Sequence, residues 1–275
     1  MLQHHLYRQC SDKRTVSMEP TRAASAKQTP TRNRLLAALP LKDYEHLLPH
    51  LEPVSLSLGW VNHAGDRKNY LHFVTTGIVA RAHLMENGKA TAFAVTGNEG
   101  VLGVTSFLSG ISMPSETVVV SAGSAYRLRG DLVRREFERH SMLAALLLRY
   151  TAALIAEIGQ NAACNRHHSV DQQLCRWILS FVDRAPSKEL TITQSLIGDM
   201  LGVRREGVTV AVGYLEKAGL IDCRRGHIAV LDRAGLEARS CECYATVRSL
   251  YGRWFREEIV VPSAGVQRSA LRVSH

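Results

Sequence analysis

Residues 190–231 read LTITQSLIGDMLGVRREGVTVAVGYLEKAGLIDCRRGHIAVL, and this stretch decides the interpretation of the whole chain. Its first part predicts a capped helix, because Thr191 or Thr193 can act as N-cap and Thr191 with Gln194 has the spacing of a capping box. The apolar face of that helix is formed by Leu196, Ile197, Met200 and Leu201. Gly202 ends it, since glycine accepts the left-handed conformation found just past a helix end. A second helix is predicted to begin near Arg204.

The second helix divides into an inner and an outer face. Val208, Val212 and Leu215 have core spacing. Two helices joined by a tight glycine turn form a helix-turn-helix, whose second helix fits the major groove of double-stranded DNA with its N-terminal end toward the bases. There a guanidinium pairs with guanine, a carboxylate accepts from cytosine, and a valine methyl contacts thymine. The side chains predicted to contact DNA from these two helices are Thr193, Gln194, Arg204, Arg205, Glu206, Thr209 and Val210.

Residues 219–231 follow as two short predicted strands around an Arg224-Arg225-Gly226 turn. Such a basic hairpin next to a helix-turn-helix is a wing, and Arg224, Arg225 and His227 are its candidates for phosphate contacts. An ordinary helical hairpin with solvated arginines is the alternative. The order of capped helix, glycine turn, arginine-led helix and basic hairpin favours DNA binding.

The first half of the chain has the pattern of a β domain. Short helices are expected over residues 34–51, where Pro40 and Pro49 limit their length. Asn87-Gly88 is a strong hairpin signal, because a type I′ turn needs positive φ at both central residues. Strands are predicted at Val54–Leu58, Tyr70–Thr75, Ile78–Met85, Thr117–Val120 and Ala125–Leu128. Many short strands at this spacing indicate a closed or double-layered β structure.

A long helix is predicted from Asp131 to about Asn165, a stretch without proline. One stripe of this helix is apolar and consists of Leu143, Leu147, Tyr150, Leu154 and Ile158. The spacing leaves open whether the stripe packs on its own domain or pairs with another chain as in a coiled coil. Further helices are expected at Val170–Val182 and around Ala245–Glu257.

The succession of strands, striped helix and winged helix resembles the Crp/Fnr family of bacterial transcription regulators. The resemblance covers residues 34–236 and is strongest in GDMLGVRREGV, residues 198–208. It implies an α+β fold with an N-terminal β-roll (a cyclic-nucleotide-binding-like jelly roll), a long dimerisation helix and a C-terminal winged helix-turn-helix. The domains implied are a disordered basic tail (1–33), the β-roll sensor (34–135), the dimerisation helix (136–166), the DNA-binding domain (167–236) and a C-terminal tail (237–275).

The resemblance also implies a function, that of a homodimer on two-fold-related DNA sites. It favours the dimer interpretation of the stripe Leu143, Leu147, Tyr150, Leu154 and Ile158. By the same likeness Arg205 and Glu206 take the family's base-reading positions. Val210 and Gly207 stand where the cyclic-AMP receptor protein has an arginine and a threonine, so no operator sequence is transferred.

The sensor departs from the family's phosphate-binding pattern. The matching stretches are Gly97–Gly103 and Met113–Glu116, in which Val101 replaces the glutamate and Pro114 the arginine. Losing that arginine removes the charge-assisted contact that a cyclic phosphate most needs. The sequence therefore disfavours cyclic AMP. It leaves open a small-molecule effector of unknown identity or a ligand-independent regulator that responds only to its own abundance, and no cofactor is predicted.

Metal binding is not expected from the cysteines. The family's iron–sulfur sensors use clustered N-terminal cysteines, and Cys10 stands alone. Cys164 with His167 and His168 offers soft and imidazole ligands but lacks a fourth. Cys241-Glu-Cys243 has no second pair nearby in the sequence, so free thiols are predicted.

A rival from another class is a metal-dependent, cupin-like β-roll enzyme with a helical appendage. His63, His72 and His83 lie in the strand region, but no His-x-His pair of the cupin type occurs. Nucleophile elbows, phosphate loops and dinucleotide fingerprints are also missing from the sequence. We therefore expect a protein that is not an enzyme.

Composition bounds these interpretations. The chain has 275 residues and a net charge of +9, with seven basic and two acidic side chains in residues 1–34 alone, so the charge does not by itself identify a DNA-binding core. The strongly apolar run Met142–Leu148 is far shorter than the ~20 residues that span a bilayer. No signal-peptide pattern occurs, and the irregular cysteines are not a disulfide framework. A cytoplasmic protein without membrane contact is expected.

Overall fold

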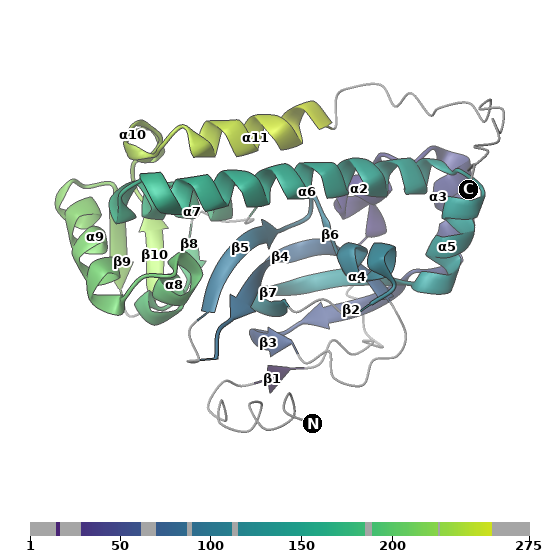
Figure 1. The fold of residues 1–275 in the computed structure, drawn as a ribbon, viewed down its shortest axis with the longest axis horizontal. Helices are drawn as coiled ribbons and strands as arrows, with labels where there is room; N and C mark the ends of the chain where they lie inside the picture. The colour runs from purple at the N-terminus through teal and green to yellow at the C-terminus, as the bar shows by residue number, and fades with distance from the viewer. Residues whose placement is uncertain are drawn as a thin grey trace, which may run out of the picture.

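Two long antiparallel strands, β4 (Tyr70–Leu84) and β7 (Glu116–Arg129), form the centre of the N-terminal half (Figure 1). The computed structural model describes residues 15–16, 29–61, 70–86, 90–111, 115–184, 189–224 and 226–254. The other elements of this half are β1 (Thr15–Val16), η1 (Pro30–Arg32), α2 (Arg34–Ala37), α3 (Leu41–Leu47), η2 (Leu48–His50), β2 (Glu52–Leu56), β3 (Gly59–Val61), β5 (Ala90–Thr96), β6 (Val101–Leu102) and α4 (Val104–Ser109). The strand order is β1-β3-β7-β4-β5, with β2 also on β7 and β6 on β4.

The four separate strands predicted in residues 70–85 and 117–128 are two continuous strands in the structure, β4 and β7, and their pairing register is irregular. The register of β4 against β7 shifts around Gly77, which has φ +84°. A Cβ at Gly77 would lie 2.6 Å from the backbone oxygen of Ser121, so only glycine allows this approach. Glycine here bends a strand and does not end it. β4 and β5 pair antiparallel as a hairpin, while Asn87 and Gly88 themselves lie outside the described residues.

The predicted long helix is two helices, α5 (Gly130–Glu138) and α6 (Met142–His167). His140 adopts φ +50°, and the Ser141 side chain caps α6 by accepting from the Ala144 backbone N–H. Neither proline nor glycine marks this break, which explains why a single helix is predicted there. Residues 136–138, assigned to the dimerisation helix, belong to α5.

The apolar stripe of α6 is buried in its own chain. Leu143, Leu147, Tyr150 and Leu154 are each at most 1% exposed, and they share one cluster with Phe73 of the sheet and with residues of α2 and α11. Ile158 is half-buried against the same cluster. The dimer-interface assignment of this stripe is therefore corrected, because side chains that fill the chain's own core are not available to a partner. Of the two alternatives left by the spacing, packing on its own domain is the one observed.

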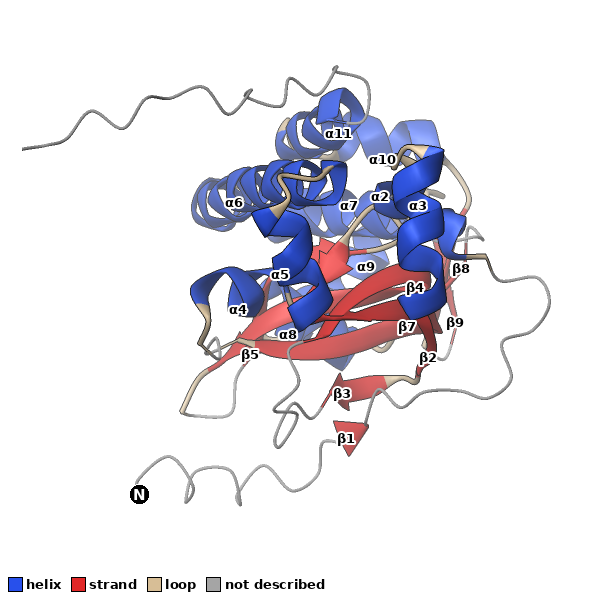
Figure 2. Ribbon diagram, turned by 90° about the vertical axis from the view of Figure 1, so that its right-hand side faces the viewer, coloured by secondary structure: helices blue, strands red, loops and turns tan. Residues whose placement is uncertain are grey.

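By length and composition alone, α6 is also a helix that could cross a membrane. Ten of its side chains are buried, and it packs between the sheet and α11 (Figure 2). These contacts are those of a core helix, and the finding is weak evidence for a membrane span.

The C-terminal half is a winged helix followed by two more helices. Its elements are α7 (Val170–Val182), β8 (Glu189–Thr191), α8 (Gln194–Leu201), α9 (Arg205–Lys217), β9 (Ile221–Arg224), β10 (His227–Val230), α10 (Arg233–Arg239) and α11 (Cys243–Trp254). The wing has three strands in the order β8-β10-β9, one more than the sequence predicts. This half does not stand apart, because Ile78, Val95 and Val120 of the sheet share one buried cluster with the cores of α7, α8 and α9.

Both predicted tails contain ordered segments. Thr15 and Val16 pair with β3, and Asn33 is fully buried, where it caps α2 and donates to Val74 O and Gly100 O. At the other end α11 runs along α6 (Figure 1), with Tyr244, Val247 and Tyr251 buried. The remaining residues of 1–28 and residues 255–275 lie outside the described part.

Candidate DNA-binding surface and sensor region

Helix α8 is fixed at both ends by local hydrogen bonds. The Thr193 hydroxyl accepts from the Leu196 backbone N–H at 3.2 Å, which makes Thr193 the N-cap. Thr191 lies in β8 instead, so the capping box predicted for Thr191 and Gln194 is wrong. Gly202 ends the helix in the left-handed conformation at φ +69°, as the sequence predicts.

Helix α9 presents its N-terminal residues to solvent. Arg204 is its N-cap, and Val208, Ala211, Val212 and Leu215 hold its inner face at no more than 1% exposure. The outer residues Arg204, Arg205, Glu206, Thr209 and Val210 are exposed. Within the described residues, Arg204, Arg205 and Glu206 make no ion pair. Their charges are therefore not used up by contacts inside the fold, and their contact with DNA stays a prediction.

Two of the predicted contact residues bind each other. The Thr209 hydroxyl donates to Gln194 Oε1 at 2.9 Å and also lies 3.0 Å from Arg205 O. This hydrogen bond joins the start of α8 to the first turns of α9 on the exposed face. Gln194 and Thr209 thus also bridge the two helices, a contact that spacing alone did not indicate.

The wing carries the second group of predicted contacts. The Arg224 side chain is 82% exposed and forms an ion pair with Asp222 at 2.9 Å. His227 is exposed on the opposite strand, paired with Arg224 in the β9–β10 ladder. Arg225 lies outside the described residues. An ion pair this exposed contributes little and can open to a phosphate.

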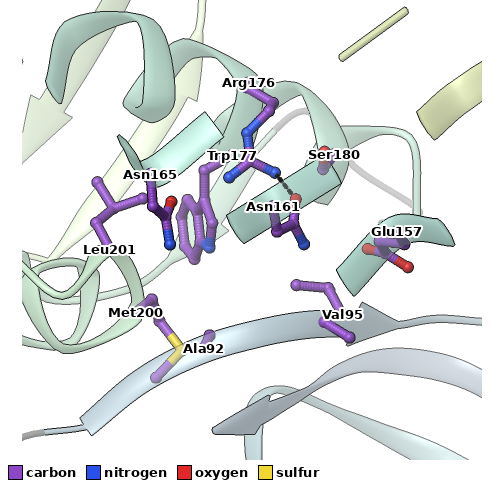
Figure 3. Close-up of a pocket in the computed structure, with 11 residues that line it drawn as sticks. Ala92, Val95, Glu157, Asn161, Asn165, Arg176, Trp177, Ser180, Met200 and Leu201 are labelled. Atoms are coloured by element: carbon purple, nitrogen blue, oxygen red, sulfur yellow. Dashed lines mark hydrogen bonds between the residues drawn. The ribbon is translucent and has the colours of Figure 1, made fainter. Parts of the chain in front are cut away.

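The winged helix docks on the sheet beside a small pocket (Figure 3). A Cβ at Gly202 would lie 2.8 Å from Thr91 Oγ1 of β5, so the helix-turn-helix glycine also touches the sheet. In the pocket wall Arg176 donates to Asn161 Oδ1 at 2.6 Å, and Asn161 donates to Phe93 O. The pocket lies between β5, α6, α7 and α8, which places it at the junction of the two halves.

A buried ion pair forms a second tie between the halves. Arg184, just after α7, donates to Glu99 Oε1 at 2.6 Å, and the two side chains are only 10% and 7% exposed. Nearby, the Tyr251 hydroxyl of α11 donates to Glu157 Oε2 of α6, also at 2.6 Å. Sequence analysis missed these four residues because partners 85 or 94 positions apart carry no local pattern.

Burial governs ionisation in this network. Burial raises the pKa of Glu157, although Arg184 and the Tyr251 hydrogen bond favour its charged form. Burial opposes the charge of Arg184, but Glu99 and Glu157 outweigh it and raise the pKa of the guanidinium. The arginine is therefore a permanent cation between two acidic side chains.

The segment that matches a phosphate cassette is packed closed. A Cβ at Gly100 would lie 2.6 Å from the Tyr150 hydroxyl, and Thr96 Oγ1 is 3.2 Å from the same oxygen. Arg81 turns inward and donates to Val101 O at 2.6 Å. Side chains of the protein thus fill the space beside residues 96–101. Pro114 lies outside the described residues.

The predicted histidines and cysteines behave differently from each other. His72 is buried in β4, His83 lies against Phe93, and neither joins a group of three possible metal ligands in the described part of the chain; His63 lies outside it.

Cysteines far apart in the sequence do converge. Cys164, His168, Cys241 and Cys243 place their donor atoms within 4.8 Å of one another, without His167.

Comparison with known proteins gives the same architecture. Residues 172–239 match the model of the Crp-like helix-turn-helix domain. Among solved structures, FixK2 from Bradyrhizobium japonicum matches with a TM-score of 0.58 at 18% identity, covering 70% of this chain and 98% of FixK2. A Eubacterium rectale protein described as a Crp/Fnr transcriptional regulator gives 0.60 at 17%, covering 76% and 98%. The c-di-GMP-responsive regulator CLP of Xanthomonas campestris gives 0.56 at 14%, covering 70% and 100%. No curated protein sequence matches the chain.

The class is thus a Crp/Fnr-type transcription-regulator fold, with a sheet-rich N-terminal domain, long helices and a C-terminal helix-turn-helix. More particularly, the chain carries a Crp-like helix-turn-helix DNA-binding domain over residues 172–239. The predicted fold class is confirmed, and the predicted likeness to the family is confirmed for the helix-turn-helix domain. None of these matches supports the cupin-like enzyme alternative.

Proposed function

We propose that the chain is a homodimeric transcription regulator that reads a two-fold-related operator through α9, in the cytoplasm of a bacterium. The observation that carries the proposal is the exposed N-terminal end of α9. Its inner face is buried in the core, while Arg204, Arg205 and Glu206 are exposed and make no ion pair within the described residues. A recognition helix contacts base edges through these first residues. Arg224 of the wing adds a phosphate contact.

The test is selection of genomic DNA fragments on the purified protein, followed by affinity measurements on the recovered site. Arg205→Ala should cost about 1–3 kcal/mol and relax the preference at one base pair. The matched control is Arg134→Ala, which removes an exposed arginine of α5. Equal affinity of wild type and Arg205→Ala for the same operator would refute the role of α9.

The dimer needs a different face of α6 from the one the sequence indicated. Opposite the buried stripe, a second set of small and apolar residues is solvent-exposed and repeats every three or four positions: Leu148, Ala152, Ile155, Gly159 and Ala162. Leu148 is 54% and Ile155 65% exposed. Such a 3-4 spacing is that of a coiled-coil seam, and small residues allow two helices to approach closely. A second copy of α6 fits this seam.

Sedimentation tests the seam. Ile155→Glu should convert the dimer to a monomer and weaken operator binding, because two linked recognition helices roughly 34–36 Å apart read a two-fold site. Leu41→Glu, which alters a residue 71% exposed on α3, should leave the dimer intact. A wild-type monomer, or an Ile155→Glu dimer, would refute this seam.

Regulation is proposed to act through the contacts between the halves. The shared core and the Arg184–Glu99 pair tie the winged helix to the sheet. A small-molecule signal that binds one arrangement better shifts the population toward it. The closed packing around Gly100 and Tyr150 supports an effector other than cyclic AMP. Thermal-shift screening tests this, because a ligand of the native state raises Tm.

A further inference from the structure

Four possible metal ligands meet where α6 ends and α11 begins. Cys164 lies in the last turn of α6 and His168 follows the helix directly. Cys241 lies in the connection between α10 and α11, and Cys243 is the first residue of α11. Cys164 Sγ is 3.5 Å from Cys241 Sγ, and Cys243 Sγ is 3.6 Å from His168 Nδ1. The three thiols are buried and the histidine is half-buried.

These separations fit one small ion in tetrahedral coordination. With Zn–S bonds of about 2.3 Å, two thiolates on the same zinc lie about 3.8 Å apart. All four donor atoms here lie within 4.8 Å of one another, so modest side-chain shifts reach that geometry. An iron–sulfur cluster places several atoms between its thiolates and therefore needs ligands spread more widely.

A second layer of polar groups already holds the ligands. His168 Nε2, the ring nitrogen that faces away from the thiols, lies 3.3 Å from Glu242 Oε1. Histidines bound to metals through one nitrogen usually donate from the other to a carboxylate, which fixes the ring. Gln160 Nε2 donates to Cys243 Sγ at 3.0 Å. Both contacts orient the donor atoms inward.

Core filling alone does not explain this arrangement. The three cysteines form a cluster of their own, separate from the large apolar clusters of the protein. Apolar packing also gives no reason for an imidazole nitrogen to turn toward a thiol. Convergence of three sulfurs and one nitrogen from two segments 77 residues apart is what a Cys₃His ion site requires.

We propose that Cys164, His168, Cys241 and Cys243 bind a single Zn²⁺ ion. Four protein ligands leave no coordination position for a substrate, so the site is structural. The ion joins the end of α6, where the winged helix begins, to the start of α11, where the winged-helix half returns to the sensor. It therefore fixes the C-terminal helix on α6.

The first measurement is the metal content of the full chain, purified with a reducing agent from cells supplied with zinc. One zinc per chain is expected. After removal of the metal, Co²⁺ titration should give the visible absorption of a tetrahedral cobalt–thiolate centre at one equivalent. Chelation should also lower Tm, since binding of the ion is coupled to folding. Wild type alone suffices for these readouts, so they do not depend on a variant that folds.

Variants then locate the site. Cys241→Ser and His168→Ala should lose the zinc, whereas Cys223→Ser, a half-buried thiol of the wing outside the cluster, should keep one zinc per chain. Absence of both zinc and cobalt binding in wild type would overturn the proposal. So would retention of zinc by Cys241→Ser, iron with labile sulfide in place of zinc, or a Cys164–Cys241 disulfide in place of zinc in the protein purified under these reducing conditions.

Discussion

Glu99→Gln tests the tie between the two halves, because it removes one charge of the Arg184–Glu99 pair and keeps the shape of the side chain. Arg184 also donates to Ser180 O, so the guanidinium keeps one partner in the variant. Glu157 remains as the nearby acidic group. The variant thus isolates the buried charge pair from other contacts of the arginine.

The magnitude follows from burial. With side chains 10% and 7% exposed and a separation of 2.6 Å, the pair belongs to the buried class. Removing one partner of such a pair costs about 3–5 kcal/mol, because the other charge stays buried without its partner. The remaining contacts of Arg184 place the expected loss near the lower end, about 3 kcal/mol. Arg184→Met together with Glu99→Gln should cost less than the sum of the two single changes.

Urea unfolding followed by tryptophan fluorescence measures these losses. The control is Asp131→Asn, which removes the exposed Arg129–Asp131 pair, whose side chains are 57% and 48% exposed. Its effect should be far smaller, because water screens exposed pairs. If Glu99→Gln destabilised the protein no more than Asp131→Asn, the interpretation of a buried, interdomain ion pair would be refuted.

Four further substitutions test other parts of the structure. Burial raises the pKa of Glu157, so the folded chain holds the proton of this carboxyl group more tightly than the unfolded chain. The contribution of Glu157 to the free energy of unfolding is full below pH 4.5 and declines as the pH rises through the folded pKa. Glu157→Gln should remove this pH dependence from the urea midpoints. Gly202→Ala should lower stability by about 1–2 kcal/mol, because Gly202 has a φ of +69° and lies against Thr91. Gly213→Ala should raise stability by about 1 kcal/mol, because Gly213 lies in the interior of α9 with open space around it. Thermal unfolding in which the two variants shifted Tm in the same direction would contradict this. Arg224→Ala should reduce the salt slope of DNA binding by about 1 without changing base preference, and an unchanged slope in filter-binding assays would exclude its phosphate contact.

Local signals predicted the elements that depend on local chemistry. Helix α7 has the bounds expected from its apolar spacing, and the Gly202 turn was readable because few other residues adopt its backbone conformation. The break between α5 and α6 was not readable, since it rests on a positive φ at His140 and no proline or glycine marks it. The break predicted between the strands Tyr70–Thr75 and Ile78–Met85 is wrong, because a glycine that bends a strand, as Gly77 does, looks the same in a sequence as one that ends it.

Periodicity in the sequence cannot decide which face of α6 is buried. Its residues repeat at helical spacing on two faces, and only the positions of the sheet and α11 show that Tyr150 faces inward and Ile155 outward. The same limit applies to sites built from distant segments. Cys164 and His168 were recognisable as possible ligands, but their partners near Cys241 become neighbours only when α11 folds back along α6.

The return of α11 has a mechanical consequence. A domain tethered at one end can swing about a single pivot, but here the chain enters the winged helix from α6 and leaves it to lie along that same helix. Rotation of the domain is therefore restrained at both of its ends, by α6 where the chain enters and by α11 where it leaves. The hydrogen bond from Tyr251 to Glu157 holds α11 on α6. Removing the residues after Ser240 would therefore remove α11 and widen the range of orientations that the winged helix can adopt.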